Sequence, residues 1–152
     1  MRIATPADVP QLLELMTAFY AESGYELDRT NAQHAFETLI ADSRLGFVWL
    51  LEVDGQTVGH LVLTLKFAME YGGLSACLDD LFALKAFRNK GLSQAALEEL
   101  RGFCRERSIC AVTVEVGTEN PAAQRVYRRA GFVELEGRQL LGLALAAPSH
   151  VV

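Results

Sequence analysis

The segment 78–116 constrains the fold most, because a strand, a helix and a second strand follow one another directly. Residues 78–84 form a mainly apolar run, and residues 92–107 carry an apolar stripe at helical spacing. Residues 111–116 alternate valine with other residues, which is typical of a half-buried strand. Two strands joined through a helix lie parallel in one sheet, with a right-handed crossover.

The rest of the chain adds elements on both sides of this unit. Asp54-Gly55 is a strong signal for a hairpin turn. Asn120-Pro121 begins a helix and Gly131 ends it. We expect strands at 3–4, 47–53, 58–67, 78–84, 111–116, 132–136 and 139–145, and helices at about 9–19, 31–42, 92–107 and 121–130. The sequence predicts one α/β (α+β) domain over residues 1–152, with a mixed sheet of about seven strands and about four helices.

Composition limits the kind of protein this can be. A chain of 152 residues with 51% hydrophobic residues can bury an adequate core without disulfides or a structural metal. Its three cysteines, Cys77, Cys104 and Cys110, include no C-x-x-C pair, so we predict reduced thiols, no metal site and a cytoplasmic location. The three histidines are spread along the chain and predict no site. No apolar run is long enough for a membrane span.

Charge indicates which partners to expect. The net charge of -5 argues against a nucleic acid partner, whose binding depends on clustered Lys and Arg. Residues 1–80 carry 12 acids and 4 bases, whereas residues 81–152 carry 7 acids and 10 bases. This division suggests two types of ligand meeting in one domain. The sequence leaves open whether two chains associate as a homodimer.

The most informative motif is the polar turn at residues 87–94, which leads from a strand into the clearest helix. The first turn of a helix presents unpaired N–H groups and the positive end of the helix dipole, which favour an anion. Gly91 allows a close approach of the backbone, and Arg88 and Lys90 add positive charge. A solvated basic turn without a ligand is the alternative interpretation.

This turn resembles the R/Q-x-x-G-x-G/A motif of the GNAT superfamily of acetyl-CoA-dependent N-acetyltransferases. About 30 residues later, residues 120–132 resemble the family's N-x-x-A-x-x-x-Y-x-x-x-G-F signature, and the order of elements is also the family's. Asn89 and Ser93 depart from the first motif, because the family usually has Gly and then Gly or Ala at these two positions. Asn is the non-glycine residue best able to adopt a left-handed conformation, so the turn can survive.

The resemblance implies that acetyl-CoA binds between splayed parallel strands. Its pantetheine arm would pair with the backbone of the strand before the turn, and its pyrophosphate would bind the turn. The residues implied to bind the cofactor are Phe82, Ala83, Leu84, Arg88, Asn89, Lys90, Gly91, Leu92, Ser93, Gln94, Asn120, Ala123 and Tyr127. Asn120 has a simpler interpretation as a helix cap, and both roles can hold together.

Three residues are candidates for the chemistry. By resemblance, Tyr127 holds the family's general-acid position and would protonate the departing thiolate. The alternative is a core aromatic at helical spacing. An ammonium acceptor must lose a proton before it attacks, and Asp79 or Asp80 can take that proton, directly or through water. The run at residues 78–82 resembles a segment of polyamine-acetylating members in which the first acid matches Asp79, which we prefer; an ion-pair role is the alternative for each acid.

The acceptor is the least determined partner. The loop where the family places its acceptor wall contains Tyr20, Glu22, Tyr25, Glu26 and Asp28, and Glu70 and Tyr71 are further candidates. These acidic and aromatic side chains suit a small cationic amine, as in small-amine or diamine acetyltransferases. The alternatives are a protein amine as acceptor, or a non-catalytic acyl-CoA-binding regulatory module.

Overall fold

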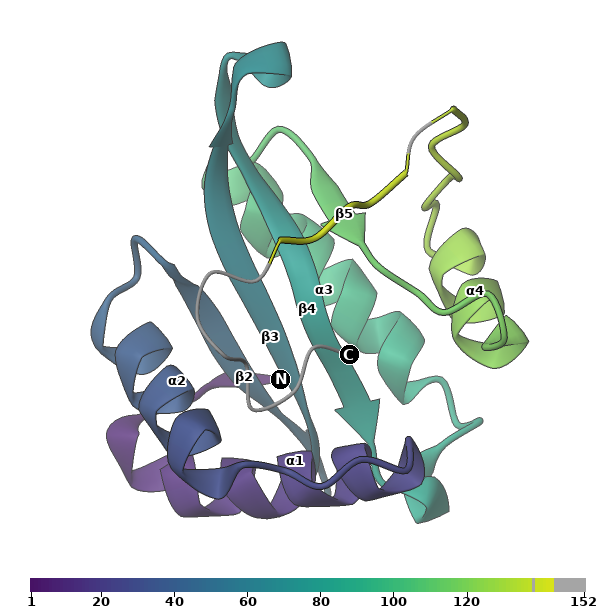
Figure 1. The fold of residues 1–152 in the computed structure, drawn as a ribbon. Coiled ribbons are helices and arrows are strands. Elements are labelled where there is room, and N and C mark those ends of the chain that lie inside the picture. Colours follow the sequence, from purple (N-terminus) through teal and green to yellow (C-terminus); the bar gives the residue numbers. More distant parts are fainter. Residues whose placement is uncertain (138, 144–152) are drawn as a thin grey trace.

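One five-stranded sheet organises the part of the chain that this computed structural model describes, residues 1–137 and 139–143 (Figure 1). The strand order is β1-β2-β3-β4-β5. The strands are β1 (Arg2–Ile3), β2 (Gly46–Val53), β3 (Gln56–Ala68), β4 (Gly73–Ala83) and β5 (Val112–Val114). Neighbours are antiparallel except β4 and β5, which are parallel as the strand-helix-strand pattern predicts.

Four α-helices cover the two faces of this sheet. They are α1 (Val9–Glu22), α2 (Arg29–Ala41), α3 (Leu92–Glu106) and α4 (Pro121–Arg129), with short 3-10 turns η1 (Pro6–Asp8), η2 (Met69–Tyr71) and η3 (Lys85–Phe87). One core lies under α1 and α2 and includes Leu12, Phe36 and Val62. The other lies under α3 and includes Leu78 and Leu100. The mixed α+β class and the four helices are confirmed.

The described residues form five strands, slightly fewer than the predicted number of about seven. Residues 132–136 and 139–143 form no strand, and the remainder of the last predicted strand, residues 144–145, lies outside the described residues. Phe132 instead packs against the core, and its N–H donates to the carbonyl oxygen of Tyr127 at 3.0 Å, which completes the end of α4. Val133 is 79% exposed, so this segment does not bury one face as a strand in the sheet would.

Two turns follow local sequence as predicted. Asp54 and Gly55 both have positive φ, 51° and 77°, which is the geometry of a two-residue hairpin between β2 and β3. Asn89 has a φ of 60°, so it adopts the left-handed conformation that the missing glycine would have supplied. The chain therefore keeps both turns without further glycines.

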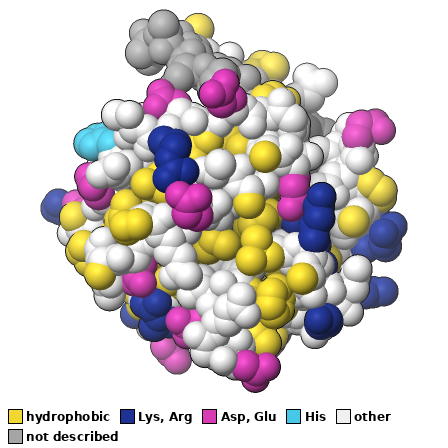
Figure 2. Space-filling model, turned by 90° about the horizontal axis from the view of Figure 1, so that it is seen from below, with side chains coloured by type: hydrophobic (Ala, Val, Ile, Leu, Met, Phe, Trp, Pro, Cys, Tyr) yellow, Lys and Arg dark blue, Asp and Glu magenta, His cyan; other side chains and the backbone are white. Residues whose placement is uncertain are grey.

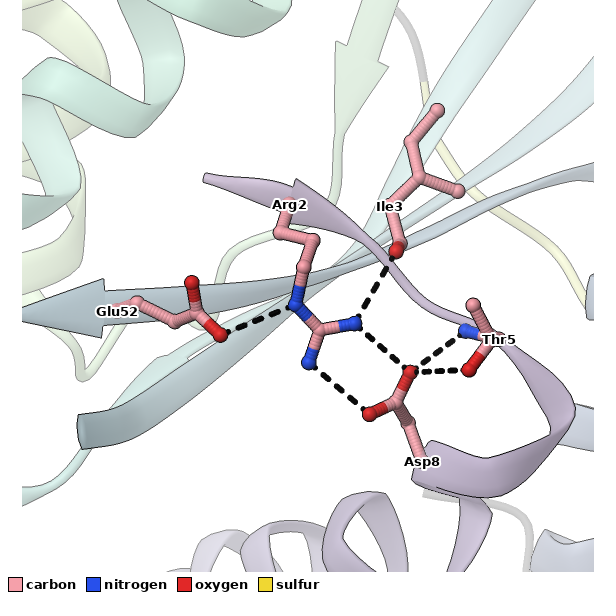
Figure 3. A network of polar contacts seen from close by, with 5 residues as sticks. All are labelled: Arg2, Ile3, Thr5, Asp8 and Glu52. Atoms are coloured by element: carbon pink, nitrogen blue, oxygen red, sulfur yellow. Dashed lines mark hydrogen bonds and ion pairs between the residues drawn. The ribbon is translucent and has the colours of Figure 1, made fainter. Parts of the chain in front are cut away.

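The N-terminal segment is fixed by an ion network (Figure 3). Arg2 donates to both carboxylate oxygens of Asp8, at 2.9 and 3.0 Å, and to Glu52 of β2 at 3.0 Å. Asp8 also accepts from the backbone N–H and the hydroxyl of Thr5. Arg2 holds the pKa of Asp8 well below its usual range. The network joins β1, the start of α1 and β2.

Candidate active site

The edge of β4 that faces β5 opens halfway along the strand. Pairing between the two strands ends at Leu78 and Val114, whereas β4 continues to Ala83. The described part of β5 therefore leaves residues 79–83 without a partner on this side. Figure 1 shows β5 and the segment leading to α4 turning away from β4. The predicted splay of the two parallel strands is present.

Backbone groups of two residues point to this open edge. Leu84 donates its N–H to Val58 of β3 at 2.8 Å, and successive strand residues direct their backbone groups to opposite sides. Ala83 and Leu81 therefore face the opening, whereas Phe82 and Leu84 face β3. Arg88 Nε donates to the Ala83 carbonyl oxygen at 2.7 Å, which agrees with this placement. Leu81 is thus the backbone position that sequence reasoning missed.

The start of α3 lies just beyond β4 and carries no side-chain cap among the described residues. Gly91 has a φ of 82°, and the first helical hydrogen bond runs from Ala95 N to Gly91 O at 2.9 Å. The N–H groups of Leu92, Ser93 and Gln94 therefore precede the helical hydrogen-bond ladder. A Cβ built on Gly91 would meet no atom within 4 Å, so the space beside the turn is open. This arrangement suits an anion.

Arg88 makes its side-chain contacts with β4 and α1. Its guanidinium donates to both carboxylate oxygens of Glu22, at 2.9 and 2.7 Å, and its Cζ lies 5.4 Å from the centre of the Phe82 ring. Glu22 is a predicted acceptor residue and Arg88 a predicted cofactor residue. The structure pairs their charges with each other across the opening.

The start of α4 is built differently. The Asn120 side chain accepts from the N–H of Ala123 at 3.0 Å, and Pro121 has no N–H to satisfy. The predicted capping role of Asn120 is confirmed. This helix therefore begins with its donors largely satisfied, unlike α3.

The end of α4 holds Tyr127 in place. Gly131, with a φ of 92°, donates to Arg128 O, and Phe132 donates to Tyr127 O, each at 3.0 Å. This pair of bonds is a Schellman motif, and the rings of Phe132 and Tyr127 meet at 5.6 Å. Burial raises the pKa of Tyr127 to about 12, and the charge of Asp80 adds to the rise. Tyr127 therefore keeps its proton at neutral pH and lies within the electrostatic reach of Asp80.

The two adjacent acids differ in environment because of a β-bulge. The register of β3 against β4 pairs Leu63 with Leu78 and Val62 with Asp80, which leaves Asp79 without a partner. Asp79 is exposed and lies beside Cys77, whose pKa is raised to about 11 by burial and then by the Asp79 carboxylate. The Asp80 side chain is only 16% exposed. The pKa of Tyr20 is raised mainly by burial and also by the negative charge of Asp80.

His60 is a buried neighbour of Asp80 that sequence reasoning did not connect with it. It lies on β3 and is completely buried, with Nε2 at 3.8 Å from Asp80 Oδ2. A lone histidine within a strand pattern gave no signal of this. Asp80 faces His60 only because of the bulge at Asp79, and the sequence does not indicate that bulge.

The predicted acceptor residues divide among three places. Tyr20 and Glu22 belong to the last turns of α1, which continues farther than predicted because no glycine precedes Gly24. Tyr25 and Glu26 are exposed in the connection to α2, whereas Asp28 caps α2 by accepting from Asn31 N at 3.0 Å.

Glu70 and Tyr71 do not join this group. They lie in η2 at the tip of the β3–β4 hairpin, at the opposite end of the molecule from α1 in Figure 1. There they line an open cavity of about 490 Å³ together with Lys66, Ser75 and Thr113.

The end of the molecule that carries α1 shows no separation of charge. Seen from below in Figure 2, hydrophobic side chains form a band across the middle, with acidic and basic side chains interspersed beside it. The pairs Arg88–Glu22 and Arg29–Glu14, each at 2.7 Å, belong to this mixture. No helix of the described residues is long and apolar enough to cross a membrane.

Comparisons with known proteins agree on the fold. The family model for the acetyltransferase (GNAT) family matches residues 9–132. An integron cassette protein from the mobile metagenome of Cole Harbour Salt Marsh is 44% identical, with 97% of this chain and 91% of that chain covered and a TM-score of 0.87. The search of curated proteins found no match.

Two more distant structures show the same fold. A predicted acetyltransferase from Clostridium acetobutylicum, solved with acetyl-CoA, is 17% identical over 93% of this chain and 94% of that chain, with a TM-score of 0.78. A ribosomal-protein-alanine N-acetyltransferase from Brucella melitensis biovar Abortus 2308 is 18% identical over 93% and 97%, with a TM-score of 0.74. The chain belongs to the GNAT family of acetyltransferases, whose acetyl donor is acetyl-CoA.

Proposed function

We propose that this protein is an N-acetyltransferase that transfers the acetyl group of acetyl-CoA to a primary amine of a small, cationic acceptor. Attack is direct, with donor and acceptor bound together. One observation carries the proposal: the unpaired half of β4 contains the mostly buried carboxylate of Asp80 and leads to the uncapped start of α3.

The described residues fit acetyl-CoA at the cofactor side. The N–H groups at the start of α3 and the open space beside Gly91 suit its pyrophosphate. Ala83 and Leu81 offer backbone groups to its pantetheine arm. Bound there, acetyl-CoA supplies a thioester whose carbonyl carbon accepts the amine nitrogen.

Asp80 is the base that the geometry favours. A carboxylate that takes a proton from an ammonium group must be close to the acetyl group and sheltered from bulk water. Asp80 is sheltered, with a side chain only 16% exposed, and its charge contributes to the raised pKa of Tyr127, the proposed acid. Asp79, the residue preferred from the sequence, is exposed at the bulge beside Cys77.

Tyr127 is the proposed acid. Its phenol stays protonated because burial raises its pKa to about 12, so it can donate a proton to the departing sulfur. The Schellman motif at the end of α4 and the Phe132 ring restrict where the phenol can point. The chain thus holds an acid and a base near the open edge of β4.

A small cationic acceptor is supported by the side chains near the opening. Asp80 supplies negative charge, and Tyr20 and Tyr25 supply aromatic faces that attract cations. Glu22 contributes less than the sequence suggested, because Arg88 neutralises it. Diamines, polyamines, amino acids and aminoglycoside-like molecules are the acceptor classes to test.

The test is release of free thiol from acetyl-CoA with a panel of these amines and with protein amines. We expect turnover with at least one small cationic amine. Acetyl-CoA binding without turnover for any amine would identify a non-catalytic acyl-CoA-binding module. Turnover confined to protein amines would assign that acceptor class instead.

A further inference from the structure

We propose that His60 is a positioning residue for Asp80, in which Nε2–H of the imidazole donates to Oδ2 and holds the carboxylate toward the acceptor amine. The inference rests on the proposed role of Asp80 as the base. It adds a second polar residue to the acceptor side, contributed by β3.

Burying the His60 side chain destabilises the folded protein unless its imidazole makes a polar interaction. The residue has no exposed surface, and neither ring nitrogen has a hydrogen-bond partner among the described residues. Burying a polar group without a hydrogen bond destabilises the folded state. A phenylalanine would fill the same space without that cost. Packing alone therefore does not account for an imidazole at this position.

Aromatic neighbours fix the orientation of the imidazole. The His60 ring meets Phe36 at 6.3 Å and 90°, Phe19 at 6.4 Å and Phe82 at 5.8 Å. These rings come from α2, α1 and β4. They surround the imidazole with apolar surface and leave the Asp80 carboxylate as its nearby polar group.

The bulge at Asp79 brings the two polar groups to one face. Leu78 packs in the core under α3, and regular alternation would place Asp80 on that same face. The extra residue at the bulge reverses the alternation of side chains along β4. Asp80 therefore lies opposite Val62, on the face under α1 and α2. His60 lies opposite Phe82, two residues along, and is thus a diagonal neighbour of Asp80.

The separation is consistent with a contact that forms when ligands bind. Nε2 and Oδ2 are 3.8 Å apart, longer than a hydrogen bond, and rotation of the Asp80 side chain can shorten this distance. Hydrogen bonds in active sites are often long without ligands and tighten in the reacting complex.

Other polar groups from the neighbouring elements also face the pair. The charge of Asp80 helps burial to raise the pKa of Tyr20 of α1, and Arg88, which pairs with Glu22, lies over the Phe82 ring. Phe36 comes from α2. Tyr20 and Arg88 are therefore the neighbours that a test must leave unchanged.

The first test is a double-mutant cycle with His60→Phe and Asp80→Asn, measured as kcat for the best amine. We expect His60→Phe to lower kcat about tenfold in the native background and to have no further effect beside Asp80→Asn. His60→Gln, whose amide nitrogen can reach the position of Nε2, should recover most of the loss. Equal losses from His60→Phe in both backgrounds would overturn the proposal.

The second test needs no activity. Long-range proton–nitrogen NMR spectra of the full chain, recorded with coenzyme A bound, report the Nε2 resonance of His60. Asp80→Asn should move that resonance, and Asp79→Asn should leave it in place. An Nε2 resonance unmoved by Asp80→Asn would refute the pairing even in an active enzyme. If instead no amine is acetylated but the resonance moves, the proposed function fails and the pair stands.

Discussion

The two sides of the open β4 edge are built from different parts of the chain. The proposed cofactor side consists of backbone: the N–H groups of α3 and the strand groups of Ala83 and Leu81. The proposed acceptor side consists of side chains: Asp80, with His60 Nε2 at 3.8 Å from its carboxylate, and Tyr20, whose pKa the charge of Asp80 helps to raise. Changes on the cofactor side should therefore act on the KM for acetyl-CoA, and changes on the acceptor side on kcat.

Substitution of Tyr127, the proposed acid, should have one of the two largest effects. Tyr127→Phe keeps the ring contact with Phe132 but removes the proton, so kcat should fall about a hundredfold. A loss of less than about threefold at saturating substrate would refute the acid role.

The pH profile offers a separate check on Tyr127. Because its pKa is raised to about 12, the phenol remains protonated, and its ionisation should cause no loss of activity below about pH 10. Rates measured from pH 6 to 10 for native protein and Tyr127→Phe test this. An alkaline loss in that range that disappears in Tyr127→Phe would contradict the prediction.

One added negative charge at each helix start tests whether the start of α3, and not that of α4, binds the anion. Ser93→Asp places a carboxylate in the first turn of α3, where it repels the pyrophosphate, so KM for acetyl-CoA should rise about tenfold. Ala122→Asp makes the same change at the matching position of α4 and should leave that KM unaltered. Equal rises in both variants would show that α3 is not the anion site.

The Arg88–Glu22 pair joins the two sides and should have a smaller effect. Glu22→Gln releases the guanidinium, which can then turn to the nearby anion, so KM for acetyl-CoA should fall about threefold. Arg88→Gln removes the guanidinium itself, so the KM for acetyl-CoA should not fall in that variant. A rise in KM from Glu22→Gln would indicate that the pair organises the cofactor side instead of competing with it.

The N-terminal network is distant from both sides and should affect stability alone. Arg2 lowers the pKa of Asp8, so the pair stabilises the fold above the usual carboxyl pKa of about 3.9 and loses this effect as pH falls through the lower, folded value. Arg2→Gln should lower Tm slightly at pH 7 without changing kcat or KM. A Tm difference that persists unchanged at pH 2 would contradict this linkage.

The cofactor side was largely predictable because it depends on local turns. The left-handed Asn89, the start of α3 at Gly91 and the Asn120 cap all follow from residues close together in sequence. The direction of Arg88 was not predictable, since its partner Glu22 lies 66 residues away.

The acceptor side was predictable only in part. Adjacent acids on a strand indicated a carboxylate near the opening, but which one faces inward depends on a bulge in the pairing of β3 with β4. Alternation of side chains holds only while the register is regular, so no pattern within β4 alone could select Asp80 or identify His60. The strand predicted at 132–136 is absent because Phe132 completes the end of α4, and the residues after it pair with no strand among the described residues.

The most direct test of the acceptor side compares Asp80→Asn with Asp79→Asn, measuring kcat for the best amine and the Kd for acetyl-CoA in the same preparations. We predict that Asp80→Asn lowers kcat about a hundredfold with an unchanged Kd for acetyl-CoA, and that Asp79→Asn has a much smaller effect on kcat. A larger loss in Asp79→Asn, or full activity in both variants, would contradict the assignment of Asp80 as the base.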